Sequence, residues 1–182
     1  MARNFKNVRT ITLTAVLLAL TVAGNTITKI PIALGLEIRF GFVFFSVISF
    51  LFGPIIAFAA GIIENTLSFF LSAGGFAFDI RYGLNAGLAG ILYAVFLYKR
   101  NVKSKYFIIW VAAAKISVNF ICNIIVNTYL LRGYLGSAAE VLTIARLYKN
   151  IGMLPIEILI MFFVLRAVSG AAAGYNFVKK RE

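Results

Sequence analysis

Residues 40–72 read FGFVFFSVISFLFGPIIAFAAGIIENTLSFFLS, an apolar stretch in which Glu64 is the only charged residue. As a single helix this stretch would be roughly 50 Å long, whereas the hydrocarbon core of a bilayer is about 30 Å thick. Gly53-Pro54 lies near its middle, and a proline removes a backbone donor and clashes with the preceding helical turn. We therefore expect two helices, 40–52 and 54–72. The first is short, so its membrane span can begin in the preceding loop.

The rest of the 182-residue chain is similarly apolar. Hydrophobic residues make up 62% of the sequence, and the mean hydropathy is +0.95. Charged residues make up 13%, about half the share of a soluble domain. Further apolar runs at 10–28, 82–98, 106–131 and 148–168 are long enough to cross a bilayer. The sequence therefore predicts an all-α integral membrane protein, a six-transmembrane-helix bundle that forms a single membrane domain over 1–182.

The distribution of positive charge decides between this topology and a five-span one, in which 40–72 is a single kinked helix. With six spans and a cytoplasmic N-terminus, 11 of the 18 Lys and Arg residues lie inside, 6 lie outside, and Lys115 lies in the membrane. Five spans would reverse that bias. Because cytoplasmic loops carry the excess of positive charge, we expect six spans with both N- and C-termini cytoplasmic. The basic start and apolar residues 11–23 also fit a cleaved signal peptide, although nothing downstream resembles a secreted domain.

Several classes of function are excluded by composition. The chain has no His and one cysteine, Cys122, which excludes a disulfide or a zinc site within the chain and any catalytic triad that needs His. No P-loop motif occurs, so the chain does not hydrolyse ATP in the manner of a P-loop enzyme. The net charge of +12 is spread in short clusters between apolar runs, which favours membrane loops over nucleic-acid binding. We expect no metal and no cofactor.

Polar residues inside the expected spans are candidates for a binding site, because charges at membrane depth usually face a cavity or a partner. Glu64, Lys115 and Glu157 lie in three different spans. The alternative is purely structural, for instance a pair between Lys115 and Glu157. Lys115 also begins a stripe at four-residue spacing that stacks along one side of a helix. Three asparagines in register favour a polar cavity over simple interhelical contacts, and those expected to contact ligand are Asn123 and Asn127, with Asn119 lying deeper.

Cations gather at the expected outer ends of the spans: Arg39, Arg81, Arg146 and Lys149. Aromatic residues lie near them in the sequence. Guanidinium groups bind carboxylates in a bidentate manner, so this end suits a ligand that is aromatic at one end and anionic at the other. The alternative is that these side chains anchor the helices at the membrane interface. Two outer loops, 24–39 and 73–79, are candidates for flaps over the mouth of such a site.

The first span carries small residues at four-residue spacing, Ala15, Ala19 and Ala23. Faces of this kind let another helix approach closely. The face can pack inside this bundle, or it can dock on a separate membrane subunit.

The A-x-x-x-A motif, Ala15-Val-Leu-Leu-Ala19, resembles the docking face of the substrate-binding S component of an energy-coupling factor (ECF) vitamin transporter. The resemblance covers nearly the whole chain in size, span number and a long first outer loop. Three segments are most similar to the folate-specific members. They run from Glu37 to Pro54, from Phe78 to Tyr93, and from Asn127 to Glu157 with interruptions.

This resemblance implies a folate-binding importer subunit in the bacterial plasma membrane and no enzyme activity of its own. Its implied partners are an ECF transmembrane coupling subunit and two ATPase subunits, with the chain tilting in the membrane to release its vitamin. Arg39, Arg81, Arg146 or Lys149 would neutralise the carboxylates of folate. Asn85, Asn123 and Asn127 would bond the edges of the pterin, and Glu64 would accept hydrogen bonds from its amino and ring N–H groups.

Other functions remain open at this point. The same architecture can take riboflavin, pantothenate or a queuosine precursor. A small integral membrane enzyme is disfavoured because the acids are scattered and His is absent. A proton-coupled exporter would use Glu64 as its proton carrier.

Overall fold

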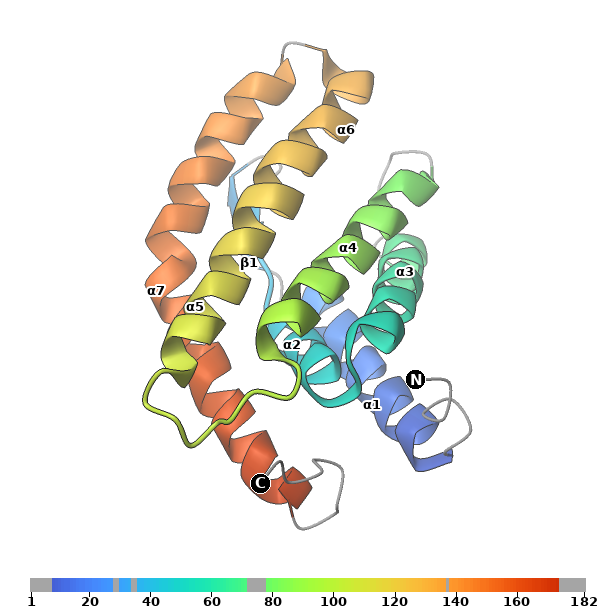
Figure 1. Cartoon of the computed structure of the whole chain (residues 1–182). Helices are drawn as coiled ribbons and strands as arrows, with labels where there is room; N and C mark the ends of the chain where they lie inside the picture. Colours follow the sequence, from blue (N-terminus) through green and yellow to red (C-terminus); the bar gives the residue numbers. More distant parts are fainter. Residues whose placement is uncertain (1–7, 28–29, 34–35, 72–77, 137, 174–182) are drawn as a thin grey trace.

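The structure is a computed structural model that describes residues 8–27, 30–33, 36–71, 78–136 and 138–173. Its elements form one helical bundle with a short hairpin after the first helix (Figure 1). In chain order they are α1 Val8–Thr26, β1 Ile30–Ala33, β2 Leu36–Ile38, α2 Gly41–Phe52, α3 Pro54–Leu71, α4 Ile80–Leu97, α5 Phe107–Ser117, the π-helix η2 Val118–Val126, α6 Asn127–Leu135 and α7 Ala138–Ala173.

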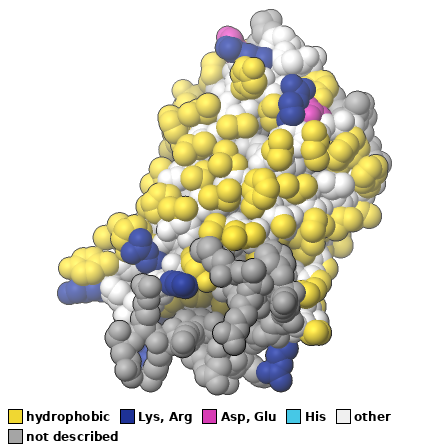
Figure 2. All heavy atoms as spheres, turned by 45° about the vertical axis from the view of Figure 1, so that its right-hand side comes forward, with side chains coloured by type: hydrophobic (Ala, Val, Ile, Leu, Met, Phe, Trp, Pro, Cys, Tyr) yellow, Lys and Arg dark blue, Asp and Glu magenta, His cyan; other side chains and the backbone are white. Residues whose placement is uncertain are grey.

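The all-α membrane fold predicted from the sequence is confirmed. Five helices are long and apolar enough to cross a membrane, with α5, η2 and α6 joined into one helix, and the shorter apolar α2 is the sixth. The bundle also exposes large apolar side chains, such as Phe163 at 65%. Figure 2 shows apolar side chains covering the middle of one face, with Lys and Arg toward its two ends. In water such a surface would be unfavourable, whereas in a bilayer it contacts lipid.

The helix break between α2 and α3 lies at Gly53-Pro54, as the sequence predicts. Gly53 has φ of +84°, a backbone conformation that favours glycine. A side chain at this position would also lie about 3.1 Å from the ring of Tyr98. At 12 residues, α2 is about 18 Å long, so it does not cross a bilayer core by itself.

Two features differ from the expected spans. The sequence predicts an outer loop at 24–39, but α1 extends through Thr26 and part of the remainder forms an antiparallel pair of strands, β1 and β2. Helix α7 begins at Ala138, ten residues before the expected start at 148. The cations at its outer end do not interrupt the helix, because two of them, Arg146 and Lys149, line an internal cavity instead of standing in a loop.

The described ends of the chain, the start of α1 and the end of α7, lie at the same end of the bundle as the α4–α5 connection (Figure 1). This is the arrangement that the six-span prediction expects. Helices α3 and α4 pack closely, and a Cβ on Gly90 would lie 2.5 Å from the carbonyl oxygen of Ala57. The core behind this contact is apolar and includes Ile48, Leu97 and Val111.

Candidate functional site

A cavity of about 610 Å³ opens among the helices and β2. Its lining comes from the second half of α3, the first half of α4 and the outer part of α7, so it lies away from the α4–α5 connection. Seven of the eight residues that the sequence predicts to bind ligand line it: Arg39, Glu64, Asn85, Asn123, Asn127, Arg146 and Lys149. The volume falls in the range of small-molecule sites, about 300–1,000 Å³.

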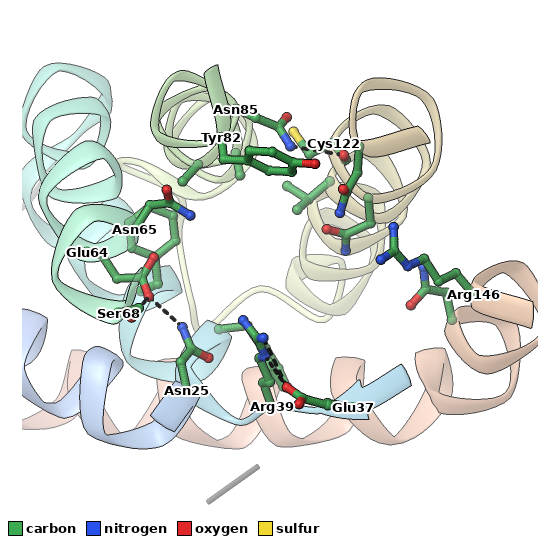
Figure 3. A pocket seen from close by; sticks show the side chains of 18 of the residues that line it. Asn25, Glu37, Arg39, Glu64, Asn65, Ser68, Tyr82, Asn85, Cys122 and Arg146 are labelled. Carbon is green, nitrogen blue, oxygen red and sulfur yellow. Dashed lines mark hydrogen bonds and ion pairs between the residues drawn. The ribbon is translucent and has the colours of Figure 1, made fainter. Parts of the chain in front are cut away.

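One wall of the cavity carries a buried acid, Glu64 of α3, with 9% of its surface exposed. Its Oε1 accepts a hydrogen bond from Asn25 Nδ2 at 2.7 Å and one from Ser68 Oγ at 2.8 Å. The second oxygen, Oε2, has no hydrogen-bond partner among the described residues. Figure 3 places Asn65, the next residue of α3, on the same wall.

Cations line the rest of the cavity: Figure 3 shows Arg146 across from Glu64, and Arg39 with Glu37 between the two. Arg39 donates to the carboxylate of Glu37 through Nε at 3.1 Å and Nη2 at 3.0 Å. Lys149 Nζ donates to the backbone carbonyl of Glu37 at 3.0 Å. Arg146 Nη1 is buried and has no hydrogen-bond partner in the described part of the chain. A buried donor of this kind is costly unless a ligand satisfies it.

The asparagine stripe lies on the helix formed by α5, η2 and α6. Asn119 Nδ2 lies 3.4 Å from Glu157 Oε2, and Asn123 Nδ2 donates to Asn119 Oδ1 at 3.0 Å. The two are inside the π-helix, whose i→i+5 hydrogen bonds make a wider turn than an α-helix. The wider turn offsets the drift of a four-residue spacing around an α-helix, so Asn123 and Asn127 both face the cavity.

At the floor of the cavity, Lys115 is buried and paired with Glu157. Its Nζ lies 3.3 Å from Glu157 Oε2 and 3.8 Å from the ring centroid of Phe42. The pairing considered from the sequence is therefore present. Since a charge buried without a partner is strongly unfavourable, this pair explains how two charges sit at this depth.

Asn85 of α4 connects two walls. Its Nδ2 donates to the backbone carbonyl of Cys122, in the π-helix, at 3.1 Å. Its Oδ1 is buried and has no hydrogen-bond partner among the described residues. The amide thus stabilises the irregular helix and leaves an acceptor for a ligand donor.

Arg81 is the one predicted binding residue that does not line the cavity. It pairs with Asp79, with Nη2 2.7 Å from Oδ2, and its side chain is 55% exposed. Asp79 does line the cavity, and it also accepts a hydrogen bond from Tyr134 of α6 at 2.9 Å. Hydrogen bonds from the side chain and backbone of Arg81 lower the pKa of Asp79 to about 2. Asp79 therefore stays charged near neutral pH, and its pair with Arg81 is lost only as the pH falls toward that value.

The sequence reasoning missed several lining residues: Asn25, Asn65, Tyr134 and Asn150. Asn25 and Tyr134 lie near helix ends, where single polar residues are ordinary, and Asn65 and Asn150 are uncharged side chains within helices, so none of the four gives a signal by itself. Helical spacing to Glu64 could have singled out Ser68, four residues away, but not Asn25, which comes from another helix. The flap expected at 73–79 falls mostly on 72–77, outside the described residues. In the described ranges, no group of three or more acidic or Cys side chains is placed to hold a metal ion.

The small residues of α1 point mostly outward. Ala15 and Ala19 are exposed, and Ala23 is half-buried. Ala23 also lines a second, apolar groove between α1 and the start of α2. The first two alanines are therefore not used for packing inside the bundle.

Comparison with known proteins gives a consistent result. A family model described as the S component of the ECF-type riboflavin transporter matches residues 5–172. The folate transporter FolT of Clostridium novyi (strain NT) is 28% identical over 127 residues, which cover 70% of this chain and 71% of that protein. A crystal structure of FolT bound with folic acid superposes with a TM-score of 0.75 at 26% identity, covering 87% of this chain and 93% of the other. The chain is a multi-pass membrane protein and belongs to the family of ECF-type riboflavin transporter S components.

Proposed function

We propose that the chain is the folate-binding S component of an ECF importer. The observation that carries this is the pair of unsatisfied groups on opposite walls of one cavity. Glu64 Oε2 is an open acceptor on one side, and Arg146 Nη1 is a buried open donor on the other. Folate has hydrogen-bond donors at its pterin end and two carboxylates at its glutamate end, so it complements both walls.

The cationic wall supports folate over the other vitamins considered. Riboflavin carries no carboxylate, so it would leave Arg146 unsatisfied, a penalty that binding sites normally avoid. Pantothenate has a carboxylate but no flat ring for the aromatic residues of the lining, such as Phe69 and Tyr82. A queuosine precursor has a pterin-like edge but no anionic tail. The family model is described by riboflavin, whereas the relative and the solved structure are named for folate.

The binding residues proposed are the seven predicted residues that line the cavity. Arg146 and Lys149 would meet the carboxylates, because Arg39 already has a carboxylate partner in Glu37. Asn85, Asn123 and Asn127 would bond polar atoms along the rings. Arg81 would act indirectly, by holding Asp79 at the wall of the cavity.

The transport step is proposed to lie in other subunits. The chain has no P-loop for ATP, so a coupling membrane subunit and two cytoplasmic ATPases would supply the energy. The S component would bind its vitamin from outside, in the bacterial plasma membrane, and tilt to release it inward. A membrane enzyme is disfavoured because the cavity acids are separated: Glu64 is bonded to Asn25 and Ser68, and Glu157 to Lys115.

Isothermal calorimetry on the purified chain tests the vitamin. We expect folate to bind with sub-micromolar affinity, and riboflavin, pantothenate and thiamin to give no heat at the same concentration. Calorimetry is preferred over fluorescence, because the single Trp110 packs against Arg100 and Phe96, away from the cavity. If folate gives no heat and another vitamin binds, the assignment of folate as the substrate is wrong.

The docking role of α1 gives a second test, with Ala19→Phe. Because Ala19 is exposed on α1 and does not line the cavity, we expect folate affinity to remain unchanged. Affinity for the coupling subunit should fall by about 10-fold or more, equal to about 1.4 kcal/mol, since bulk on a small-residue face keeps a partner helix away. Co-purification with the coupling subunit measures this. Val95→Phe, at an exposed site on α4, is the matched control, and equal co-purification of both variants would exclude the α1 face.

A further inference from the structure

Glu64 is held more rigidly than a typical cavity acid. Both hydrogen bonds that it makes to described residues go to Oε1, one from Asn25 of α1 and one from Ser68, one turn away on α3. The side chain therefore has one oxygen occupied by the protein and one left over, with the position of the second determined by the first.

The orientation of Asn25 is itself restricted. Its Oδ1 lies so close to Gly41, the first residue of α2, that a Cβ on that glycine would overlap it. The amide of Asn25 therefore occupies space that is open only because residue 41 has no side chain. With its oxygen against Gly41, Asn25 directs its nitrogen toward Glu64. Two donors from two helices thus fix the carboxylate before a ligand arrives, which lowers the cost of ordering it on binding.

A carboxylate held in one position favours a flat heterocycle whose edge presents hydrogen-bond donors to it. A 2-amino-4-oxo ring, as in a pterin, presents two neighbouring N–H donors from the amino group and the ring nitrogen, and the two lone pairs of the open oxygen, Oε2, accept both donors. A 2,4-dioxo ring, as in a flavin or a lumazine, presents an oxygen next to one N–H. Its oxygen would face Glu64, and two acceptors in contact repel.

We propose that Glu64, held by Asn25 and Ser68, is the specificity-determining residue that selects a 2-amino-4-oxo ring over a 2,4-dioxo ring. This inference rests on the proposed function, because it assigns the ring end of the ligand to the α3 wall. Arg146 and Lys149, on the opposite wall, do not contribute to this choice, since they meet the tail.

The test compares folic acid with its 2-oxo analogue, in which oxygen replaces the exocyclic amino group and the tail is identical. Calorimetry with the wild-type chain is expected to favour folic acid by about 30-fold or more, because a site built to bond a group rejects the analogue that lacks it. In Glu64→Gln the amide offers one acceptor and one donor, which match the N–H and the oxygen of the 2-oxo ring but set a donor against one of the two donors of the amino ring, so the preference should fall below about threefold or reverse. Asn25→Ala should also reduce the preference, because Glu64 loses one of its two fixed donors.

Glu37→Gln is the matched control, since it makes the same substitution at another residue that lines the cavity, on β2. Its preference for folic acid should equal that of the wild type. A wild-type chain that binds both compounds equally overturns this inference and leaves the proposed function standing. A Glu64→Gln chain that keeps the wild-type preference also overturns it. If the wild-type chain binds neither compound, the proposed function itself fails.

Discussion

Arg146→Gln is expected to weaken folate binding by about 100-fold or more. Arg146 is half-buried on α7, and its Nη1 has no hydrogen-bond partner among the described residues. Glutamine keeps a polar group but removes the charge and the planar fork that binds a carboxylate. Removing one partner of a buried, hydrogen-bonded charge pair costs about 2–5 kcal/mol, and 1.4 kcal/mol is tenfold in affinity. Calorimetry on the purified variant gives the measurement, with the melting temperature recorded to show that the bundle remains folded.

Arg81→Gln is the matched control, with the same change at the same end of the bundle. Arg81 is exposed and already paired with Asp79, and exposed ion pairs contribute about 0–1 kcal/mol. We expect folate affinity to stay within about threefold of the wild type, a limit that corresponds to less than 1 kcal/mol. If Arg81→Gln loses as much affinity as Arg146→Gln, the carboxylates bind at the mouth of the cavity and not at α7.

This difference between two arginines marks what the sequence could predict and what it could not. Charge in an apolar chain is conspicuous, so the sequence predicts Glu64, Arg146 and Lys149 as site residues, and all three line the cavity. The partner of each charge is a tertiary property. Asp79 is two residues from Arg81, but nothing in the sequence says that the pair forms on the outside while Asp79 itself lines the cavity.

The helix boundaries show the same difference between local features, which the sequence predicts, and tertiary ones, which it does not. The break at Gly53-Pro54 depends on local chemistry, and it lies where expected. The early start of α7 and the hairpin β1–β2 depend on what surrounds them. Cations on the outer part of α7 suggested a loop because charges usually face water, whereas here they face a polar cavity. The π-helix around Asn119 and Asn123 also gives no local signal, and one of its carbonyls is stabilised by Asn85 of another helix.

Lys115→Met is the second large expected effect, this time on stability. Lys115 is buried, and its partners are Glu157 Oε2 at 3.3 Å and the ring of Phe42. Removing the cation leaves Glu157 in the bundle with Asn119 as its one remaining hydrogen-bond donor among the described residues. Breaking a buried ion pair in this way costs about 3–5 kcal/mol. The free energy of unfolding in detergent, or the melting temperature of the purified chain, measures the loss.

The double variant Lys115→Met/Glu157→Leu distinguishes an unpaired charge from simple loss of packing. A buried pair replaced by apolar residues of similar volume is often neutral or stabilising, so the double variant should recover most of the stability lost in Lys115→Met. If it does not, Lys115 stabilises the bundle through contacts such as Phe42 and not through its charge. The folate affinity of the double variant then tests whether the Lys115–Glu157 pair contributes to binding. Because Glu157 lines the cavity floor, a stable double variant that binds folate normally would make the pair structural, and one that is stable but binds poorly would make the floor part of the site.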